Sequence, residues 1–246
     1  MRKGTLIWSL CCAAVLTMLI VSCKKDKPIS PLNFGYTYFP NNVGHYVIYN
    51  VDSLVANPLR PSGVDTSIYQ IKEVIDSIFP DASGRPTQRI VRYKRANDSS
   101  LWVLEKVWSG NLTTTDAEVV EDNIRYVKLI FPTNLNATWN GNGFNILGAQ
   151  NYQYTSVNVP LTLNNTYFDS TVAVLQDSNM NLVAHQFYQE IYATGVGLIS
   201  KKIINLSDSG FNPLLNTANL QVNYALFKQM SYGSIIYSET YVSSGN

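Results

Sequence analysis

The chain offers few side chains for catalysis. Its 246 residues include two histidines, His45 and His185, and three cysteines, Cys11, Cys12 and Cys23. No His-x-x-x-His or Cys-x-x-Cys spacing occurs, so we expect no metal site of that kind. The Gly-x-Ser-x-Gly nucleophile motif is missing as well, although a Ser-His-Asp set could still assemble in space because serines are plentiful. These observations favour a protein that is not an enzyme and that carries no cofactor.

Cys23 follows an apolar segment near the start of the sequence. Arg2 and Lys3 precede an almost entirely apolar run from about Thr5 to Val21. A short basic segment followed by an apolar stretch and a small residue is typical of a secretory signal. The alternative is a membrane-spanning helix that is never cleaved, because the run is at the short end of spanning length.

The tetrapeptide Ile20-Val21-Ser22-Cys23 resembles the lipobox of bacterial lipoproteins. The resemblance implies cleavage before Cys23, a diacylglyceryl group on its thiol, and acylation of its new α-amino group, with palmitate as the expected acyl chain. Several acyl chains anchor a protein firmly, because each buried methylene contributes about 0.8 kcal/mol. Lys24 stands where Asp would imply retention in the inner membrane, so the resemblance favours the outer membrane, with its face left open.

These features divide the chain into a signal peptide (1–22), a polar tether (23–35) and a single β-rich domain (36–246). Cleavage would remove Cys11 and Cys12, so the exported domain would contain neither a free thiol nor a disulfide. It is long enough to bury a core without them. Basic and acidic side chains nearly balance, 18 against 17, which argues against a nucleic-acid partner. The expected partners are the membrane, through the lipid, and a protein or glycan.

Two further stretches raise the question of ligand binding. Trp139 and Phe144 flank a run of Asn and Gly and could stack on a ligand such as a sugar ring, although aromatic residues more often fill sheet cores. The acidic stretch from Asp116 to Asp122 lacks the EF-hand pattern. We interpret it as a solvated face opposite basic side chains of a neighbouring strand. Those side chains are Arg89, Arg92, Lys94 and Arg95.

Three serines are candidate glycan attachment sites. Ser53, Ser77 and Ser170 each follow an Asp and precede an aliphatic residue or Thr. The pattern resembles the O-glycosylation motif of exported proteins in the Bacteroidota. A motif this short also occurs by chance in a chain rich in Ser and Thr.

A period of two in the apolar residues predicts most of the strands. The predicted strands are Tyr46–Val55, Ser67–Phe79, Thr87–Ala96, Leu101–Trp108, Ile124–Phe131, Asn151–Val159, Thr166–Gln176, Leu198–Leu206 and Ser231–Val242. Ile124–Phe131 is apolar on both faces and stops at Pro132, which indicates a central strand. Glu73 is the exception on an otherwise aromatic and aliphatic face.

Turns rich in Asn and Gly separate these strands. Val183–Ala193 is either a further strand or a short helix, and Asp208–Asn223 is a long loop. About ten short strands of this kind favour an all-β, mainly antiparallel fold, either a β-sandwich or an open barrel, with room for one short helix.

Segments near both ends of the domain resemble a known group of proteins. Tyr38-Phe39-Pro40 followed by Gly44, and Ile191-Tyr192-Ala193 followed by Gly195-Val196-Gly197, resemble the opening and closing segments of β-rich bacterial envelope lipoproteins. The resemblance implies the fold and brings no activity with it.

We therefore expect a lipid-anchored envelope protein that binds a protein, a glycan or an apolar ligand, or that serves as a structural module. The alternative is an envelope-associated hydrolase of polysaccharide or ester substrates, which would use paired carboxylates or a histidine. A third possibility is an accessory subunit without a ligand of its own.

Overall fold

The computed structural model describes residues 33–181, 183–207 and 230–246. In this part the chain forms twelve strands and one 3-10 turn, η1 (Tyr36–Tyr38). The strands are β1 (Tyr46–Ala56), β2 (Val64–Pro80), β3 (Pro86–Arg95), β4 (Val103–Leu112), β5 (Asp116–Glu121), β6 (Ile124–Ile130), β7 (Thr138–Asn140), β8 (Asn151–Leu163), β9 (Thr166–Met180), β10 (Ala184–Ala193), β11 (Gly197–Ser207) and β12 (Ile235–Gly245). The prediction of an all-β, mainly antiparallel fold is confirmed.

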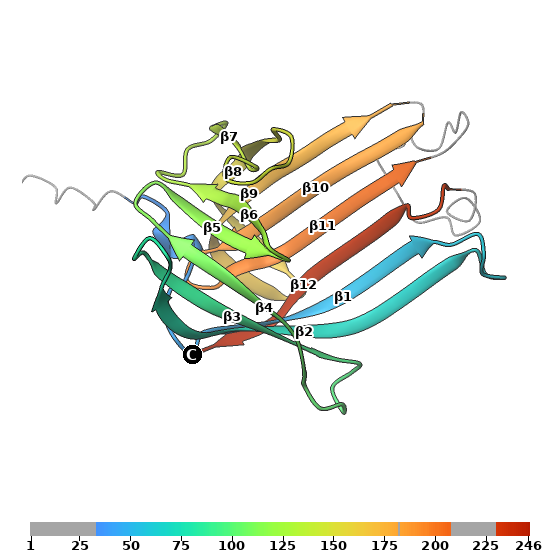
Figure 1. Ribbon diagram of the computed structural model, residues 1–246, viewed down its shortest axis with the longest axis horizontal. Coiled ribbons are helices and arrows are strands. Elements are labelled where there is room, and N and C mark those ends of the chain that lie inside the picture. Colours follow the sequence, from blue (N-terminus) through green and yellow to red (C-terminus); the bar gives the residue numbers. More distant parts are fainter. Residues whose placement is uncertain (1–32, 182, 208–229) are drawn as a thin grey trace, which may run out of the picture. The chain divides into compact units, whose positions relative to one another are not determined.

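The twelve strands of the described residues belong to one antiparallel sheet with the order β6-β5-β4-β3-β2-β1-β12-β11-β10-β9-β8-β7. Two meanders, β1 to β6 and β7 to β12, are joined where β1 pairs with β12. Figure 1 shows β9 to β12, β1 and β2 side by side, with β4, β5 and β6 folded back in front of them. The result is a nearly closed, barrel-like sheet, so the open barrel is the correct one of the two expected architectures.

The sheet closes where its two end strands meet. The Val127 amide of β6 donates to Gly141 O at 2.9 Å, and Trp139 Nε1 donates to Val127 O at 2.8 Å. The Tyr154 hydroxyl accepts from the Ile130 amide at 3.0 Å and donates to Ile130 O at 2.8 Å. The prediction that β6 is a central strand is therefore wrong, because β6 is an end strand of the sheet. The contacts with Gly141, Trp139 and Tyr154 cover its outer edge.

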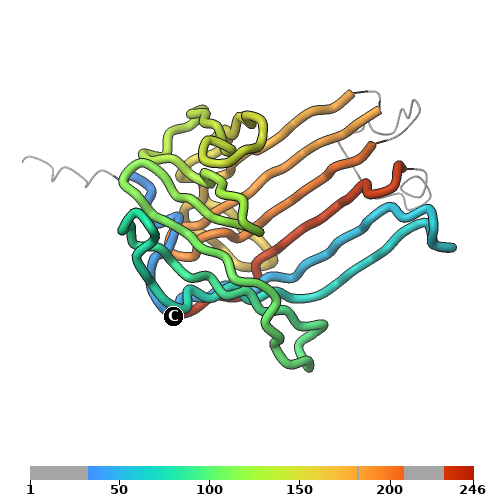
Figure 2. Tube along the Cα trace, in the orientation of Figure 1, coloured from blue at the N-terminus to red at the C-terminus, as the bar shows by residue number. Residues whose placement is uncertain are grey.

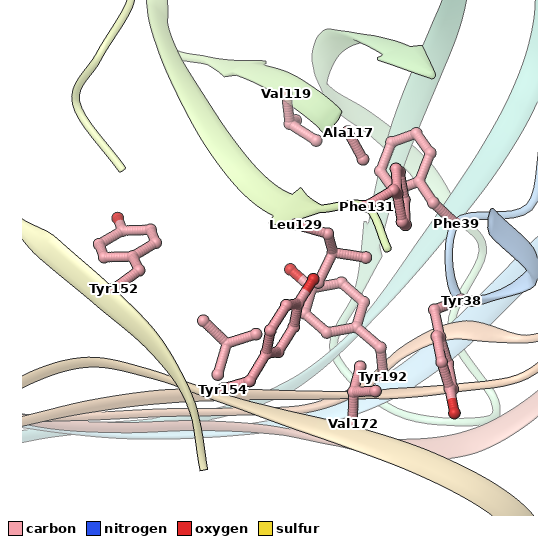
Figure 3. Close-up of a cluster of buried hydrophobic side chains, with 11 residues drawn as sticks. Tyr38, Phe39, Ala117, Val119, Leu129, Phe131, Tyr152, Tyr154, Val172 and Tyr192 are labelled. Carbon is pink, nitrogen blue, oxygen red and sulfur yellow. The ribbon is translucent and has the colours of Figure 1, made fainter. Parts of the chain in front are cut away.

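A cluster of buried, mostly aromatic side chains lies inside the curved sheet, near the contact between β6 and β7 (Figure 3). Tyr38 and Phe39 enter from η1 and pack with Leu129 and Phe131 around β6 and with Tyr154 of β8. Tyr38 is fully buried, and its hydroxyl group hydrogen-bonds Ser170 and Asn158. Residues 38 and 39, which belong to the blue segment before β1 in Figure 2, are thus part of the core.

The nine strands predicted from period two are confirmed, and Val183–Ala193 forms the strand β10 rather than a helix. Two strands were not predicted, the acidic β5 and the three-residue β7. The predicted loop Asp208–Asn223, the signal peptide and Cys23 lie outside the described residues, as does nearly all of the tether. In the described ranges, no helix is long and apolar enough to cross a membrane.

Candidate functional site

Charged side chains lie on the inward face of the sheet in two cross-strand rows. In the first row, Lys201 of β11 is opposite Glu190 of β10 and opposite Glu239 of β12. In the second row, Glu73 of β2 is opposite Arg92 of β3. Opposite charges that face each other across a ladder stabilise the pairing of the strands, so the register itself brings these groups together.

Lys128 of β6 joins the first row from the opposite wall. Its Nζ lies 2.9 Å from Glu190 Oε1 and 2.6 Å from Oε1 of Glu121, at the end of β5. Lys201 Nζ lies 3.4 Å from both Glu121 and Glu190. The Tyr192 hydroxyl also donates to Glu190 Oε2 at 2.5 Å. Each of the two lysines is thus shared between the same two carboxylates, which satisfies buried charges from two directions.

Arg92 holds the second row together. Its Nη2 lies 2.7 Å from Glu239 Oε1 and its Nη1 lies 3.3 Å from Glu73 Oε1. The guanidinium carbon lies 3.8 Å from the ring centroid of Trp108, a cation–π contact. Glu239 also accepts a hydrogen bond from the Tyr237 hydroxyl at 2.7 Å. Glu73 has no second polar contact within the described residues, so it is the least well paired of these carboxylates.

We call these seven ionisable side chains the charged layer. Its members are Glu73, Arg92, Glu121, Lys128, Glu190, Lys201 and Glu239. Four carboxylates therefore face three cations. Burial raises the pKa of Glu73 to about 7, because Arg92 offsets the lost hydration only in part. Burial also opposes the ionisation of Glu190, yet Lys128 and Lys201 together hold the pKa of that carboxyl below its ordinary value.

An interior cavity of about 100 Å³ lies beside the charged layer. All members of the layer except Arg92 line it. The side chains of Glu73, Glu121 and Lys201 remain 19%, 17% and 15% exposed, so water reaches the cavity. A second recess of about 280 Å³ includes Arg92 and shares Glu121, Lys201 and other lining residues with the cavity.

Much of the remaining cavity wall is apolar, although His45, Gln88 and two tyrosines also line it. Ile75 of β2 is opposite Ile90 of β3, which is opposite Trp108 of β4. This apolar row lies two residues along β2 and β3 from the pair Glu73–Arg92, so the two rows are adjacent on the same face. Cavities that combine apolar walls with a few polar groups are typical ligand sites. The arrangement can hold a small compound that has both a charged and an apolar part.

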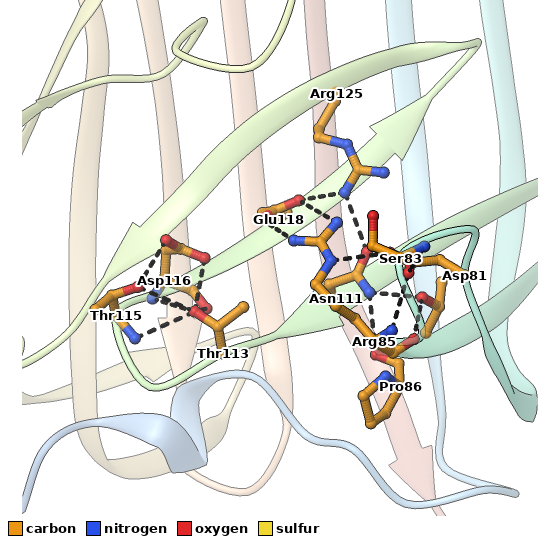
Figure 4. A network of polar contacts seen from close by, with 11 residues as sticks. Asp81, Ser83, Arg85, Pro86, Asn111, Thr113, Thr115, Asp116, Glu118 and Arg125 are labelled. Carbon is orange, nitrogen blue, oxygen red and sulfur yellow. Dashed lines mark hydrogen bonds and ion pairs between the residues drawn. The ribbon is translucent and has the colours of Figure 1, made fainter.

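The acidic stretch at β5 does not form a solvated face, so this interpretation is wrong for two of its members. Glu118 and Glu121 are three residues apart and therefore point to opposite sides of the strand. Glu121 belongs to the charged layer. Glu118 is 2% exposed and pairs with Arg85, at 2.8 Å, and with Arg125. Figure 4 shows this second network, which lies apart from Asp116 and its threonine partners.

The expected basic partners of this stretch also pair elsewhere. Arg89 contacts Asp76 at 2.7 Å, Arg95 pairs with Asp98, and Lys94 lies 3.9 Å from Glu105. The Arg95–Asp98 pair is local, three residues apart along the chain. The other two pairs join neighbouring strands, and their cross-strand register could not be read from the spacing of charges along the chain.

The two histidines lie apart from any nucleophile–base pair in the described residues. His45 lines the interior cavity, and its ring nitrogens hydrogen-bond Val196 O at 2.9 Å and Asn246 Oδ1 at 3.0 Å. His185 is buried on β10, and its Nδ1 has no hydrogen-bond partner in this part of the chain. Burial, with the charge of Lys202, lowers the pKa of His185. No group of three or more His, Cys, Asp or Glu that could hold a metal occurs in the described ranges.

The two residues of the predicted stacking loop have different surroundings. The Trp139 ring packs 4.7 Å from Tyr154 and 6.0 Å from Tyr152, measured between centroids, while its indole nitrogen helps to close the sheet. Phe144 is 57% exposed. That this loop stacks on a ligand stays a prediction.

The three candidate glycan sites all lie on strands. Ser53 is on β1, Ser77 on β2 and Ser170 on β9, and each is half-buried. The Ser170 hydroxyl is held by Tyr38 at 2.7 Å. Their glycosylation stays a prediction, as does lipid attachment at Cys23, which lies outside the described residues.

Sequence reasoning missed nearly all of the charged layer. Glu73 was noticed as the exception on an apolar face, and it was the one available signal. Lys128, Lys201 and Glu239 each lie in a segment whose apolar neighbours predict a strand, and Glu190 lies in Val183–Ala193, for which a strand and a short helix were both open. A single charge at an inward position of such a strand is the pattern that could have revealed them.

No protein-family model and no curated protein sequence matches this chain. Two crystal structures are similar to it. One is a "putative exported protein with YmcC-like fold" from Bacteroides fragilis, with 9% identity over 87% of this chain and 100% of that chain and a TM-score of 0.42. The other is a "putative lipoprotein" from Parabacteroides distasonis, with 10% identity over 88% of this chain and 100% of that chain and the same TM-score. At these values neither similarity carries an argument about function.

Breaking the first row should cost far more stability than breaking a surface pair. Glu190→Gln removes one of the two carboxylates that contact both Lys128 and Lys201 and leaves Glu121 to serve two buried cations, so we expect a loss of about 3–5 kcal/mol in the free energy of unfolding. Asp76→Asn removes the exposed partner of Arg89 and should leave the urea midpoint nearly unchanged. Equal midpoints for the two variants would contradict the importance of the charged layer for stability.

Glu73 should make stability depend on pH. Its pKa is raised from 4.5 to about 7 in the folded state, so the folded protein holds this proton more tightly than the unfolded chain. Its contribution is complete below pH 4.5 and is lost as the pH rises to about 7, on the order of 3 kcal/mol. The difference in unfolding free energy between wild type and Glu73→Gln, measured from pH 4 to 8, should fall over this window. A flat difference would disprove the assignment.

Proposed function

We propose that this protein is a lipid-anchored binding protein of the bacterial cell envelope and that its interior cavity is the ligand site. The observation that carries the binding role is the water-accessible cavity between a charged and an apolar row on the inward face of the sheet. The lipobox-like segment ending at Cys23 supports the anchor, and the balance of charge supports a ligand other than nucleic acid. We place the protein at the outer membrane because Lys24 follows the cysteine.

The cavity has the properties of a site that is formed before the ligand arrives. Its walls come from paired strands, and the ion pairs across it fix the positions of its polar groups. Rigid side chains lose little entropy on binding, which favours affinity for a small ligand. No described contact links either histidine to a serine or a carboxylate, so we place binding before hydrolysis.

Filling the cavity should abolish ligand binding. Ile90→Phe adds a larger side chain to the apolar row, whereas Ile78→Phe makes a similar change at a position that is 38% exposed. We would screen small alcohols, amines and carboxylic acids by saturation-transfer NMR against the full chain in lipid nanodiscs. We expect compounds that bind wild type and Ile78→Phe but not Ile90→Phe. If no compound binds, or if Ile90→Phe binds them equally well, the cavity is not the ligand site.

The anchor has its own test. Bacteria fed labelled palmitate should incorporate the label into wild type and into Cys12→Ser, which changes a cysteine of the signal peptide. Cys23→Ser should carry no label and should retain Met1, because the lipobox cysteine is both the acylation site and the cleavage marker. Label on Cys23→Ser, or an unmodified thiol at Cys23 in the wild type by mass spectrometry, would refute lipid anchoring.

A further inference from the structure

We propose that the interior cavity binds a small organic ammonium compound, with the ammonium group at the Glu73 carboxylate and an apolar body against Ile75, Ile90 and Trp108. This inference rests on the proposed function, because it names the ligand class of the same cavity. It is argued from the charge, the contacts and the register of the residues that line it.

The first argument is the charge of the lining. Four carboxylates and two lysines line the cavity, and Arg92 adds a third cation from beside it. Each lysine and Arg92 already contacts two carboxylates. With all four carboxylates ionised, the charged layer has one negative charge more than it has cations. A ligand that enters with one positive charge balances the site.

The second argument places this excess at Glu73. Glu239 has a 2.7 Å contact to Arg92 and a hydrogen bond from Tyr237. Glu190 is held by Lys128 and Tyr192. Glu73 has one contact, 3.3 Å to Arg92 Nη1, and its side chain is 19% exposed. It therefore keeps acceptor capacity for an ammonium group, and hydrogen bonds between two ionised groups are among the strongest in proteins.

The third argument concerns the rest of the ligand. The apolar row begins at Ile75, two residues from Glu73 on the same strand face, and continues across the register to Ile90 and Trp108. The Arg92 guanidinium already stacks on the Trp108 ring. We therefore place the apolar part of the ligand, and not its ammonium group, against Trp108. A cavity of about 100 Å³ suits a short alkyl chain rather than a sugar or a lipid. Burial of each methylene contributes about 0.8 kcal/mol.

Binding should be coupled to a proton. The groups around Glu73 are Arg92 on β3, Glu121 on β5, Lys201 on β11 and Glu239 on β12, with Tyr49 on β1. Because burial raises the pKa of Glu73 to about 7, part of the population is protonated at neutral pH. An ammonium ligand favours the carboxylate and displaces that proton. The affinity should therefore rise between pH 6 and pH 8.

The test uses three probes of equal chain length, n-butylammonium, n-butanol and n-butanoate, with the full chain in lipid nanodiscs and titration calorimetry. We expect n-butylammonium to bind at least about tenfold more tightly than the other two, equivalent to about 1.4 kcal/mol. Glu73→Gln should lose this preference and the pH dependence. Asp169→Asn, an exposed carboxylate on β9, should retain both. His45→Gln, which changes another side chain that lines the cavity, should retain the pH dependence, because that dependence is assigned to Glu73.

A second measurement does not depend on the folding of a variant. Titrations of the wild type at pH 7 in buffers of different ionisation enthalpy should show release of a fraction of a proton for each n-butylammonium bound. If n-butanol or n-butanoate binds in the cavity as well as the ammonium compound, the ligand class is wrong while the cavity remains a binding site. Absence of proton release on ammonium binding would also overturn the inference. If all three probes fail, the inference is overturned, and the broader screen with Ile90→Phe decides separately whether the cavity binds anything.

Discussion

The structure depends on ion pairs that cross the inside of the sheet. Lys128 of β6 and Glu190 of β10 belong to strands far apart in the ladder, yet they meet at 2.9 Å with almost no solvent exposure. A charge in this position is tolerated only with a partner in place, since an unpaired buried ion costs several kcal/mol. A slip of one residue in β11 would turn Lys201 outward and leave Glu190 and Glu239 without it. The pairs therefore act on both the register of the strands and the closure of the sheet.

The same constraint explains where packing is incomplete. Aromatic and aliphatic side chains have no required partner geometry and pack closely against one another. Around Tyr38, Leu129 and Tyr154 they form a fully buried core. Charged side chains must instead keep the geometry of their ion pairs, so neighbouring groups cannot move into every gap. The interior cavity lies at the boundary between these two kinds of packing, beside the charged layer and against Ile75 and Ile90. Its position follows from the ion pairs rather than from a separate feature of the fold.

Most of the fold could be predicted from local sequence, but the site could not. Period-two alternation places the strands because burial on one face acts on every second residue. It misses β5, whose acidic residues look solvated although Glu118 and Glu121 are paired on opposite faces. It also misplaces β6, because Ile124–Phe131 has the apolar faces of a central strand while closure by Gly141 and Trp139 covers its edge. The charged layer assembles side chains from seven strands. Their meeting is set by register and curvature, which no single segment contains.

The imbalance of the charged layer separates the needs of folding from the needs of function. Three cations require three carboxylates, and Glu121, Glu190 and Glu239 would be sufficient for Lys128, Lys201 and Arg92. Glu73 adds a fourth carboxylate to a buried site, where its hydration is lost and only one contact at 3.3 Å compensates. A buried group that the fold does not need, and whose ionised form the fold disfavours, is the pattern expected of a functional residue. Under the proposed binding role, a positively charged group on the ligand would supply the partner that the Glu73 carboxylate does not find within the charged layer.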